Sequence, residues 1–352
     1  MNCMKSLGTI GMVLLCLVAC GPAPYKLAES GPYHVGMRTI KLVDDSRGDR
    51  QVSITVWYPA VQPADSPSSA PTRDADPDRE GAPYPLILSS TKVAEIFALF
   101  LVSHGFAWAS VDKIDTYYST NPEMLHQPLD ILFALEQVAS NPPQGLEGMI
   151  DAEHAGAIGY SFDGFNALML GGARIDPQHY LALCADPEQT KQTAGYWFDG
   201  WYNCGLAGQW DSFSADAGEN LTASQDGLWQ PVTDERIRAV MPMAPDGFYL
   251  FGEEGLAAVD RPVLIIDATN DDLYREDVLI YEHLGTSDKA FISFVGPDHM
   301  MVYDAEMVAR MAHFAVAFFG YHLQGRQDLA RYFSEDFVAQ HDDLFWGVYP
   351  DE

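Results

Sequence analysis

The stretch that decides the fold is Ala155-Gly156-Ala157-Ile158-Gly159-Tyr160-Ser161-Phe162-Asp163-Gly164. Residues 155–159 are small or apolar, which predicts a buried strand. Residues 166–170 belong to a following helix, so the residues between the strand and this helix form a tight turn. A serine in such a strand-to-helix turn carries its hydroxyl at the carboxyl edge of the sheet. Ser161 is therefore a candidate nucleophile, unless the turn is an ordinary glycine- and serine-containing connection without chemistry.

Outward from this stretch, strands alternate with helices. The sequence predicts strands at 85–89, 106–111, 239–241, 262–267 and 290–295, and helices at 95–103, 129–140 and 307–319. The β-rich runs 37–43 and 52–57 flank a polar turn, which predicts an antiparallel hairpin. Alternation of this kind indicates an α/β fold, in which a mainly parallel central sheet is flanked by helices on both faces.

Four further segments divide the chain. Residues 20–35 are expected to be a tether before a domain over 36–325, and residues 326–352 a C-terminal tail. Residues 59–83 are rich in Pro, Ser, Ala and Asp, which predicts a long mobile loop. The aromatic-rich insertion 174–230 interrupts the alternation. It either closes a small aromatic core of its own or acts as a lid, and the two roles are compatible.

Composition narrows the function classes. The chain has 352 residues, of which 47% are hydrophobic and 20% charged, as in a folded globular protein. Lys plus Arg number 20 against 50 for Asp plus Glu, a net charge of -30. Such a surface repels phosphate backbones, so we expect no nucleic-acid partner.

The N-terminus predicts export. Lys5 precedes an apolar run over 10–19 that has the length of a signal peptide core but is too short to span a bilayer. Leu17-Val18-Ala19-Cys20 looks like a bacterial lipobox, so residues 1–19 would be removed and Cys20 lipidated. The alternative is an ordinary secretory signal. Because Gly21 rather than Asp follows the cysteine, analogy with lipoprotein sorting favours the outer membrane over the inner one, with the protein periplasmic or at the cell surface.

The cysteine count agrees with an oxidising compartment. Of five cysteines, Cys3 and Cys16 lie in the expected signal peptide and Cys20 would carry lipid. Cys184 and Cys204 remain, which predicts a disulfide between them. No CxxC motif is present, so neither a redox site nor a cysteine-based metal site is indicated.

A serine nucleophile needs an imidazole base and a carboxylate that orients it. Both follow late strands. The run 263–267 leads into an acidic turn in which Asp271 fits best, with Asp272 second and Asp267 third. The run 291–295 leads to His299, whereas the other histidines weighed lie in helices or at the ends of elements. Each group thus lies just past the carboxyl end of a strand, where open α/β sheets bind their ligands.

With these segments in place, the chain resembles the dienelactone-hydrolase-like and platelet-activating-factor-acetylhydrolase-like serine hydrolases of the α/β-hydrolase superfamily. The resemblance runs from about residue 31 to residue 325 and includes segments 31–36, 56–59, 103–106, 159–162 and 318–323. It implies that Ser161 is the nucleophile, Asp271 the orienting acid and His299 the base. The order Ser, acid, His is the order of that superfamily.

Two departures from the family concern the site that would stabilise an oxyanion. Asp163 stands where the family usually has glycine, and a carboxylate roughly 6 Å from an oxyanion opposes it by roughly 3 kcal/mol at an effective dielectric of about 20. After the first sheet strand, Ser89-Ser90-Thr91-Lys92 replaces the usual Ser-His-Gly. The expected oxyanion donors are the backbone N-H of Phe162 and that of Thr91 or Lys92.

We therefore expect an exported, lipid-anchored serine hydrolase that cleaves a carboxylic ester, needs no cofactor or metal, and acts on a small-molecule or lipid-like substrate. The contrasting hypothesis is a hydrolase fold that has lost activity and binds a ligand or partner protein. Esters, lactones, thioesters and polyesters all fit the chemistry, so sequence does not choose between an esterase and a lipase or polyester hydrolase.

Overall fold

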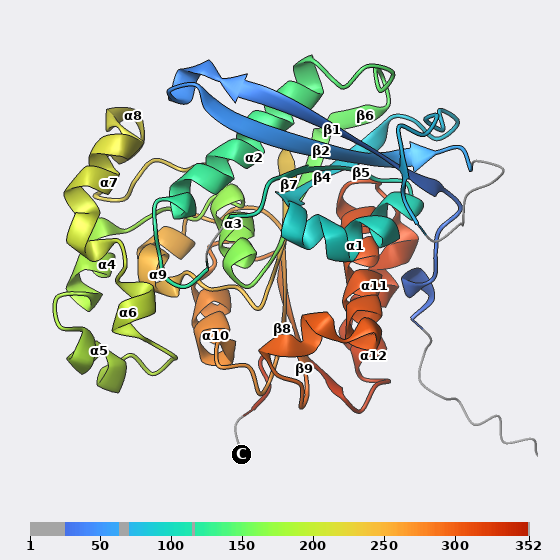
Figure 1. Ribbon diagram of the computed structural model, residues 1–352. Coiled ribbons are helices and arrows are strands. Elements are labelled where there is room, and N and C mark those ends of the chain that lie inside the picture. Colours follow the sequence, from blue (N-terminus) through green and yellow to red (C-terminus); the bar gives the residue numbers. More distant parts are fainter. Residues whose placement is uncertain (1–24, 63–69, 115–116, 351–352) are drawn as a thin grey trace, which may run out of the picture.

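The computed structural model describes residues 25–62, 70–114 and 117–350, and within them one mixed sheet forms the centre of the molecule (Figure 1). Its ten strands run in the order β10-β9-β8-β7-β6-β4-β5-β2-β1-β3. The strands are β1 (His34–Asp44), β2 (Arg50–Ala60), β3 (Thr72–Arg73), β4 (Tyr84–Ser90), β5 (Ala107–Val111), β6 (Ile150–Tyr160), β7 (Ile237–Met243), β8 (Val263–Ala268), β9 (Lys289–Phe294) and β10 (Leu344–Trp346).

The pairing is mostly parallel. Neighbours from β5 through β4, β6, β7 and β8 to β9 are parallel, and β1 with β3 is parallel too. The pairs β1–β2, β2–β5 and β9–β10 are antiparallel. The predicted α/β class, parallel sheet and N-terminal hairpin are confirmed.

Helices cover both faces of the sheet. They are α1 (Thr91–Ser103), α2 (Glu123–Ser140), α3 (Phe162–Leu170), α9 (Phe248–Leu256), α10 (Tyr274–His283), α11 (Ala305–His322) and α12 (Glu335–Val338). Side chains alternate along each strand, so one face of β8 contributes Val263 and Ile265 to a core under α2, α3, α9 and α10. Leu264 and Ile266 face the second core, under α1 and α11. Burial on both faces explains why these strands are apolar without interruption.

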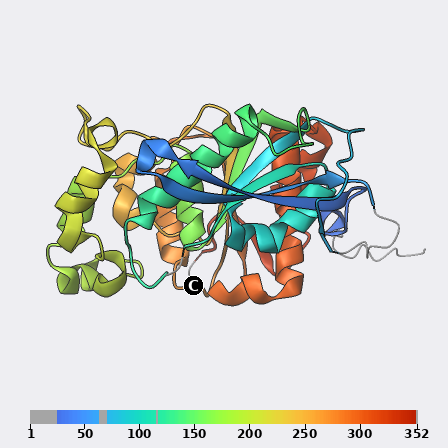
Figure 2. The ribbon, with the colours of Figure 1, turned by 45° about the horizontal axis from the view of Figure 1, so that its top comes forward.

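The β1–β2 hairpin is fastened to α2 by ion pairs. Asp130, 8% exposed, lies 2.6 Å from Arg47 and 2.8 Å from Arg50, which come from the turn end of the hairpin. Arg50 also contacts Glu123 at 2.9 Å. Figure 2 shows the hairpin, in blue, lying across the front of the central part of the molecule.

The insertion folds as a group of short helices at one end of the molecule (Figures 1 and 2). They are α4 (Pro177–Leu183), α5 (Pro187–Thr193), α6 (Gly200–Asn203), α7 (Trp210–Ala217) and α8 (Glu219–Thr222). The predicted disulfide is present, with the Cα atoms of Cys184 and Cys204 5.6 Å apart. Trp210 packs on Tyr180 and Trp229 at ring-centroid distances of 5.0 and 5.6 Å, so the insertion has an aromatic core of its own.

Several elements were not predicted, and most are short. The strand β3 lies within the predicted loop 59–83, whose residues 63–69 fall outside the described residues, and Pro59 and Ala60 belong to β2. The predicted tail returns to the sheet, because β10 pairs with β9 and Asp343 lies 2.8 Å from Arg310 of α11. The helix predicted at 129–140 begins at Glu123 and continues through Pro128.

The expected signal peptide, the lipidation site Cys20 and the first part of the tether lie outside the described residues. Within the part of the chain that is described, no helix is both long and apolar enough to cross a membrane.

The disulfide should contribute measurably to stability. The two cysteines are separated by 20 residues, and closing a loop of that size stabilises a fold by roughly 3 kcal/mol. We expect the Cys184→Ser/Cys204→Ser variant to lose about that free energy of unfolding in urea titrations. Wild-type protein with reductant should lose a similar amount, whereas an unchanged urea midpoint in both samples would show that the insertion does not depend on this bond.

Candidate active site

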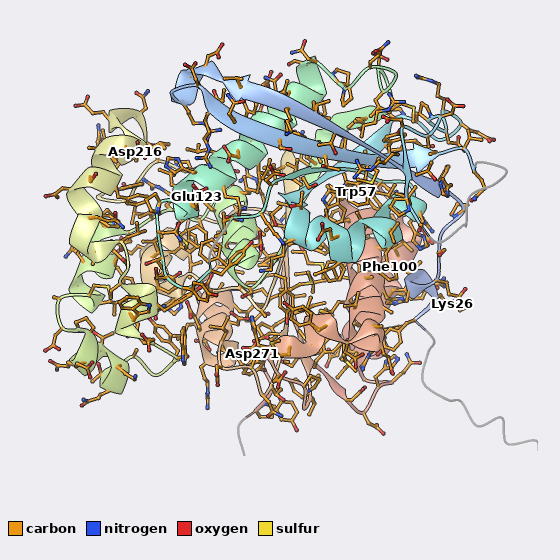
Figure 3. All side chains as sticks on the ribbon, in the orientation of Figure 1. Lys26, Trp57, Phe100, Glu123, Asp216 and Asp271 are labelled. Atoms are coloured by element: carbon orange, nitrogen blue, oxygen red, sulfur yellow. A yellow bond between two sulfur atoms is a disulfide. The ribbon has the colours of Figure 1, made fainter. Side chains whose placement is uncertain are left out.

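The site is built where neighbouring strands end. Lys92 follows β4, Ser161 follows β6, Asp246 follows β7, Asp271 follows β8 and His299 follows β9. In the sheet these five strands stand side by side in the order β9-β8-β7-β6-β4 and run parallel, so their carboxyl ends share one edge. Figure 3 labels Asp271 beside α10, in the connection that leaves β8.

Ser161 lies in a strained turn. Its φ of 61° and ψ of -130° are unusual for a residue with a side chain, and such strain is found mainly at functional sites. The turn is possible because two neighbours lack a side chain. A Cβ on Gly159 would lie 1.8 Å from the Asp163 carbonyl oxygen, and one on Gly164 would lie 2.7 Å from Pro245 Cα. The Ser161 N-H donates to the Met243 carbonyl at 2.9 Å, which ties the turn to β7.

The three residues predicted from sequence meet at this turn. The Nε2 atom of His299 lies 2.9 Å from Ser161 Oγ, and its Nδ1 atom lies 2.6 Å from Asp271 Oδ2. The Asp271 carboxylate has a side-chain exposure of 0%, whereas His299 is 34% exposed. Because a carboxylate oxygen accepts, Nδ1 carries the proton and Nε2 is left to accept from the serine hydroxyl. This arrangement can deprotonate Ser161 as it attacks an electrophile.

Further contacts hold the histidine and the acid in place. The Tyr160 hydroxyl donates to the backbone carbonyl of His299 at 2.7 Å. Asp271 Oδ1 accepts from the Leu273 N-H at 2.9 Å, which leaves Oδ2 for the imidazole. Sequence reasoning missed the role of Tyr160, although its place directly before the serine was a usable signal.

The alternative acids lie elsewhere. Asp272 is exposed, and the hydrogen bonds of the His299 ring among the described residues go to Asp271 and Ser161 instead. Asp267 is completely buried within the end of β8. Asp267 instead neighbours Asp277 of α10, itself completely buried. Burial raises the pKa of both carboxyls well above the usual range. The nearby Asp271 raises the pKa of Asp267 further, and Asp267 raises that of Asp277, because like charges repel. Asp267 Oδ2 and both carboxylate oxygens of Asp277 are buried without a hydrogen-bond partner that meets normal geometry among the described residues.

The expected oxyanion donors lie at helix starts. Phe162 is the first residue of α3, and Thr91 and Lys92 are the first two of α1, so no helical carbonyl accepts their N-H groups. Phe162 and Lys92 line the same cavity as Ser161, whereas Thr91 is not part of the cavity lining. The Thr91 hydroxyl accepts from the Lys113 N-H at 3.1 Å. Helix N-termini favour negative charge, so this edge suits an anionic intermediate.

Asp163, which sequence alone marks as a charge opposing that intermediate, has a cationic partner. Its carboxylate is 1% exposed, and its Oδ2 atom lies 3.0 Å from Lys92 Nζ. The same ammonium lies 4.4 Å from the centre of the Tyr117 ring and donates to the Tyr160 carbonyl at 3.3 Å. The pair has almost no net charge, so the repulsion calculated for an isolated carboxylate does not apply.

A cavity of about 640 Å³ opens above the serine. Aromatic side chains make up much of its wall, and two of them, Trp197 and Tyr202, come from the insertion. The remaining aromatic and apolar lining residues are Ile114, Tyr117, Tyr160, Phe162, Leu273, Met300, Val302 and Tyr303. The cavity suits a mainly apolar or aromatic ligand.

In the described ranges, no three His, Cys, Asp or Glu side chains gather in a way that could hold a metal ion. Comparison with models of known protein families matched none of them, and a search of curated proteins found no significant relative.

The Lys92–Asp163 pair generates a stability prediction. Removing one partner of a buried ion pair leaves the other charge buried without a partner, which lowers the free energy of unfolding by roughly 3 to 5 kcal/mol. Because Lys92 is 25% exposed, we expect Lys92→Met to lower the free energy of unfolding in urea by about 3 kcal/mol, the lower end of this range. Adding Asp163→Asn to Lys92→Met should recover most of the loss. A double variant no more stable than Lys92→Met would show that the two side chains are not coupled.

Glu276 generates a pH prediction. It is completely buried, and burial with the nearby Asp246 raises its pKa to about 8 from 4.5. Its Oε1 accepts from the N-H groups of Gly247 and Phe248, so Oε2 can carry the proton. The folded state then keeps a proton that the unfolded chain releases, so stability should fall as pH rises between those values, by up to roughly 1.4 kcal/mol per pH unit.

The matched variant is Glu276→Gln, which keeps an acceptor for both N-H groups and cannot ionise. Its free energy of unfolding, measured from pH 4 to 9, should fall less steeply than that of the wild type. Parallel curves for the two proteins would show that Glu276 does not hold a proton in the folded state.

Proposed function

We propose that this protein is a serine hydrolase of the α/β-hydrolase superfamily that cleaves carboxylic esters. The observation that carries the proposal is the chain of contacts from Ser161 Oγ through His299 to Asp271, at 2.9 and 2.6 Å. The strained turn at Ser161 and the order of the three residues along parallel strands support the same superfamily.

In the proposed acylation step, Ser161 Oγ attacks the ester carbonyl carbon while His299 Nε2 takes the hydroxyl proton. The Asp271 carboxylate stabilises the imidazolium that forms and keeps the ring oriented. The carbonyl oxygen becomes an oxyanion, which the N-H of Phe162 and an N-H from the start of α1 bind. When the tetrahedral intermediate collapses, the alcohol leaves with the proton from His299.

Deacylation repeats the steps with water. His299 takes a proton from a water molecule, whose oxygen attacks the acyl-enzyme carbonyl. When the second tetrahedral intermediate collapses, the acid leaves and His299 returns the proton to Ser161 Oγ. Apart from the water molecule, every catalytic group in this proposed cycle belongs to the chain.

The insertion is proposed to bind the substrate. Trp197 and Tyr202 belong to the cavity wall, and their rings lie 5.5 Å apart. Trp197, Met300 and Tyr303 are 38%, 58% and 76% exposed, so the mouth of the cavity offers apolar surface to a ligand. These features support an ester with an apolar or aromatic part.

Export and lipid anchoring remain proposals that rest mainly on the N-terminal sequence. The disulfide supports an extracytoplasmic location, because disulfides persist mainly in oxidising compartments. We propose that lipid on Cys20 tethers the protein to a bacterial membrane, preferably the outer one.

The test of the activity is hydrolysis of p-nitrophenyl acetate, butyrate and octanoate by the soluble chain that begins after Cys20. We expect turnover by the wild type and a fall of at least a thousandfold in Ser161→Ala, because the nucleophile cannot be replaced. Asp271→Asn should also lose most activity, since it holds the imidazole in the wrong tautomer.

The matched control is Asp272→Asn, which removes the neighbouring exposed carboxylate and should retain activity. Equal rates in the wild type and Ser161→Ala, with both proteins folded, would contradict the esterase proposal and favour the alternative of a ligand- or partner-binding protein.

A further inference from the structure

Asp246 is a buried carboxylate beside the proposed nucleophile that the mechanism does not use. It follows β7, is 1% exposed and lines the same cavity as Ser161. Its Oδ2 atom accepts from the Tyr202 hydroxyl at 2.6 Å. Its Oδ1 atom is buried and has no hydrogen-bond partner among the described residues. Buried acceptors without a donor are rare, because an unsatisfied buried polar group destabilises the folded state. We therefore expect a ligand in the cavity to supply the missing hydrogen-bond donor.

No side chain of the described residues supplies the missing donor. Lys92 lines the same cavity as Asp246, but its ammonium is engaged by Asp163 at 3.0 Å. Glu276 is a second acid near Asp246 and uses Oε1 for backbone N-H groups. The Tyr249 hydroxyl lies 3.5 Å from Oδ2, the oxygen that Tyr202 already occupies.

Several contacts fix the position of Tyr202 and therefore of the Tyr202–Asp246 pair. Its N-H donates to the Asp199 carboxylate at 3.3 Å, and its carbonyl accepts from the Thr120 N-H at 2.9 Å. The disulfide at Cys204 lies two residues further along the chain. Because the phenol proton is donated to Asp246, the Tyr202 oxygen can only accept from a ligand. Asp246 and Tyr202 together therefore present acceptors to the cavity.

The charged residues around the cavity favour a ligand whose hydrogen-bond donor group is neutral. A carboxylate or phosphate on the ligand would be repelled by Asp246. The other charged residues that line the cavity have both signs, Lys92 and Lys113 against Asp271 and Asp272, so they give an ammonium group no advantage over a neutral donor. A hydroxyl group carries no charge that Asp246 would repel, and it can donate to a carboxylate or accept from a carboxylic acid.

We propose that Asp246, positioned by Tyr202, binds a hydroxyl group of the substrate, so the preferred substrates are esters with a hydroxyl on the acyl or alcohol part. This inference rests on the proposed esterase function, because it places the hydroxyl relative to an ester held at Ser161. The aromatic wall takes the apolar remainder of the substrate, and the Asp246–Tyr202 pair selects hydroxylated members of that class.

The test compares matched esters that differ by one hydroxyl group. The pairs are p-nitrophenyl 3-hydroxybutyrate with p-nitrophenyl butyrate, and glycerol monobutyrate with propyl butyrate. A hydrogen bond to a buried carboxyl oxygen that otherwise has no partner predicts a ten- to hundredfold higher kcat/KM for the hydroxylated member of at least one pair. Asp246→Leu should bring that ratio close to one. The isosteric Asp246→Asn, which keeps an oxygen acceptor and the shape, should lower it about tenfold.

Asp211→Asn is the control, because it removes one exposed negative charge of the insertion that lies outside the cavity and should leave the ratio unchanged. A wild-type ratio near one for both pairs, or a ratio unchanged in Asp246→Leu and Asp246→Asn, would overturn the inference. Loss of turnover by the same factor on both members of a pair would also overturn it, since Asp246 would then serve the chemistry rather than selection.

Binding separates this inference from the proposed function. Ser161→Ala should bind glycerol monobutyrate at least tenfold more tightly than propyl butyrate in calorimetry, and Asp246→Leu in that background should remove the difference. Wild-type turnover of both esters with equal affinities would refute only the role of Asp246. Absence of both turnover and binding would refute the esterase function and the inference together.

Discussion

The close approach of α3 to the end of β6 is the constraint on which the rest of the site depends. The chain reverses within a few residues there, and Gly159 and Gly164 leave no room for a Cβ against the Asp163 carbonyl and Pro245. The reversal forces Ser161 into a strained conformation, raises its hydroxyl above the sheet edge and directs the first N-H groups of α3 toward the same point. Parallel strands on one side of the turn then bring an acid and a histidine to that edge.

A second feature of this edge is its set of buried acidic side chains, in a chain with a net charge of -30. Asp163, Asp246, Asp267, Asp271, Glu276 and Asp277 are all buried near it. Asp163 is paired with Lys92, and Asp271 is paired with His299. Asp246 accepts a hydrogen bond from the Tyr202 phenol, and burial raises the pKa values of Asp246, Asp267, Glu276 and Asp277, which favours their neutral forms. Charge at the site is thus set by local pairing, and the overall acidity of the protein does not determine it.

Sequence predicted the parts of this arrangement that are periodic or that stand next to a strand end. The apolar strands, the hairpin, the Cys184–Cys204 bond and the choice of Asp271 and His299 as neighbours of Ser161 all came from such local signals. The Lys92–Asp163 and Tyr202–Asp246 contacts could not be predicted, because no sequence motif marks either pair and each contact depends on how side chains pack in the tertiary fold. Short elements such as β10 were missed since three residues carry no periodicity, and their pairing with β9 depends on the tertiary fold.

The central claim is that Ser161 is an activated nucleophile, and covalent labelling tests it without knowledge of the substrate. A fluorophosphonate probe should add one adduct to the intact mass of the folded protein, and peptide mapping should place it on Ser161. Labelling should slow greatly in His299→Ala, which keeps the serine but removes its base. A folded wild type that takes up no probe, or that carries it on another residue, would contradict the account.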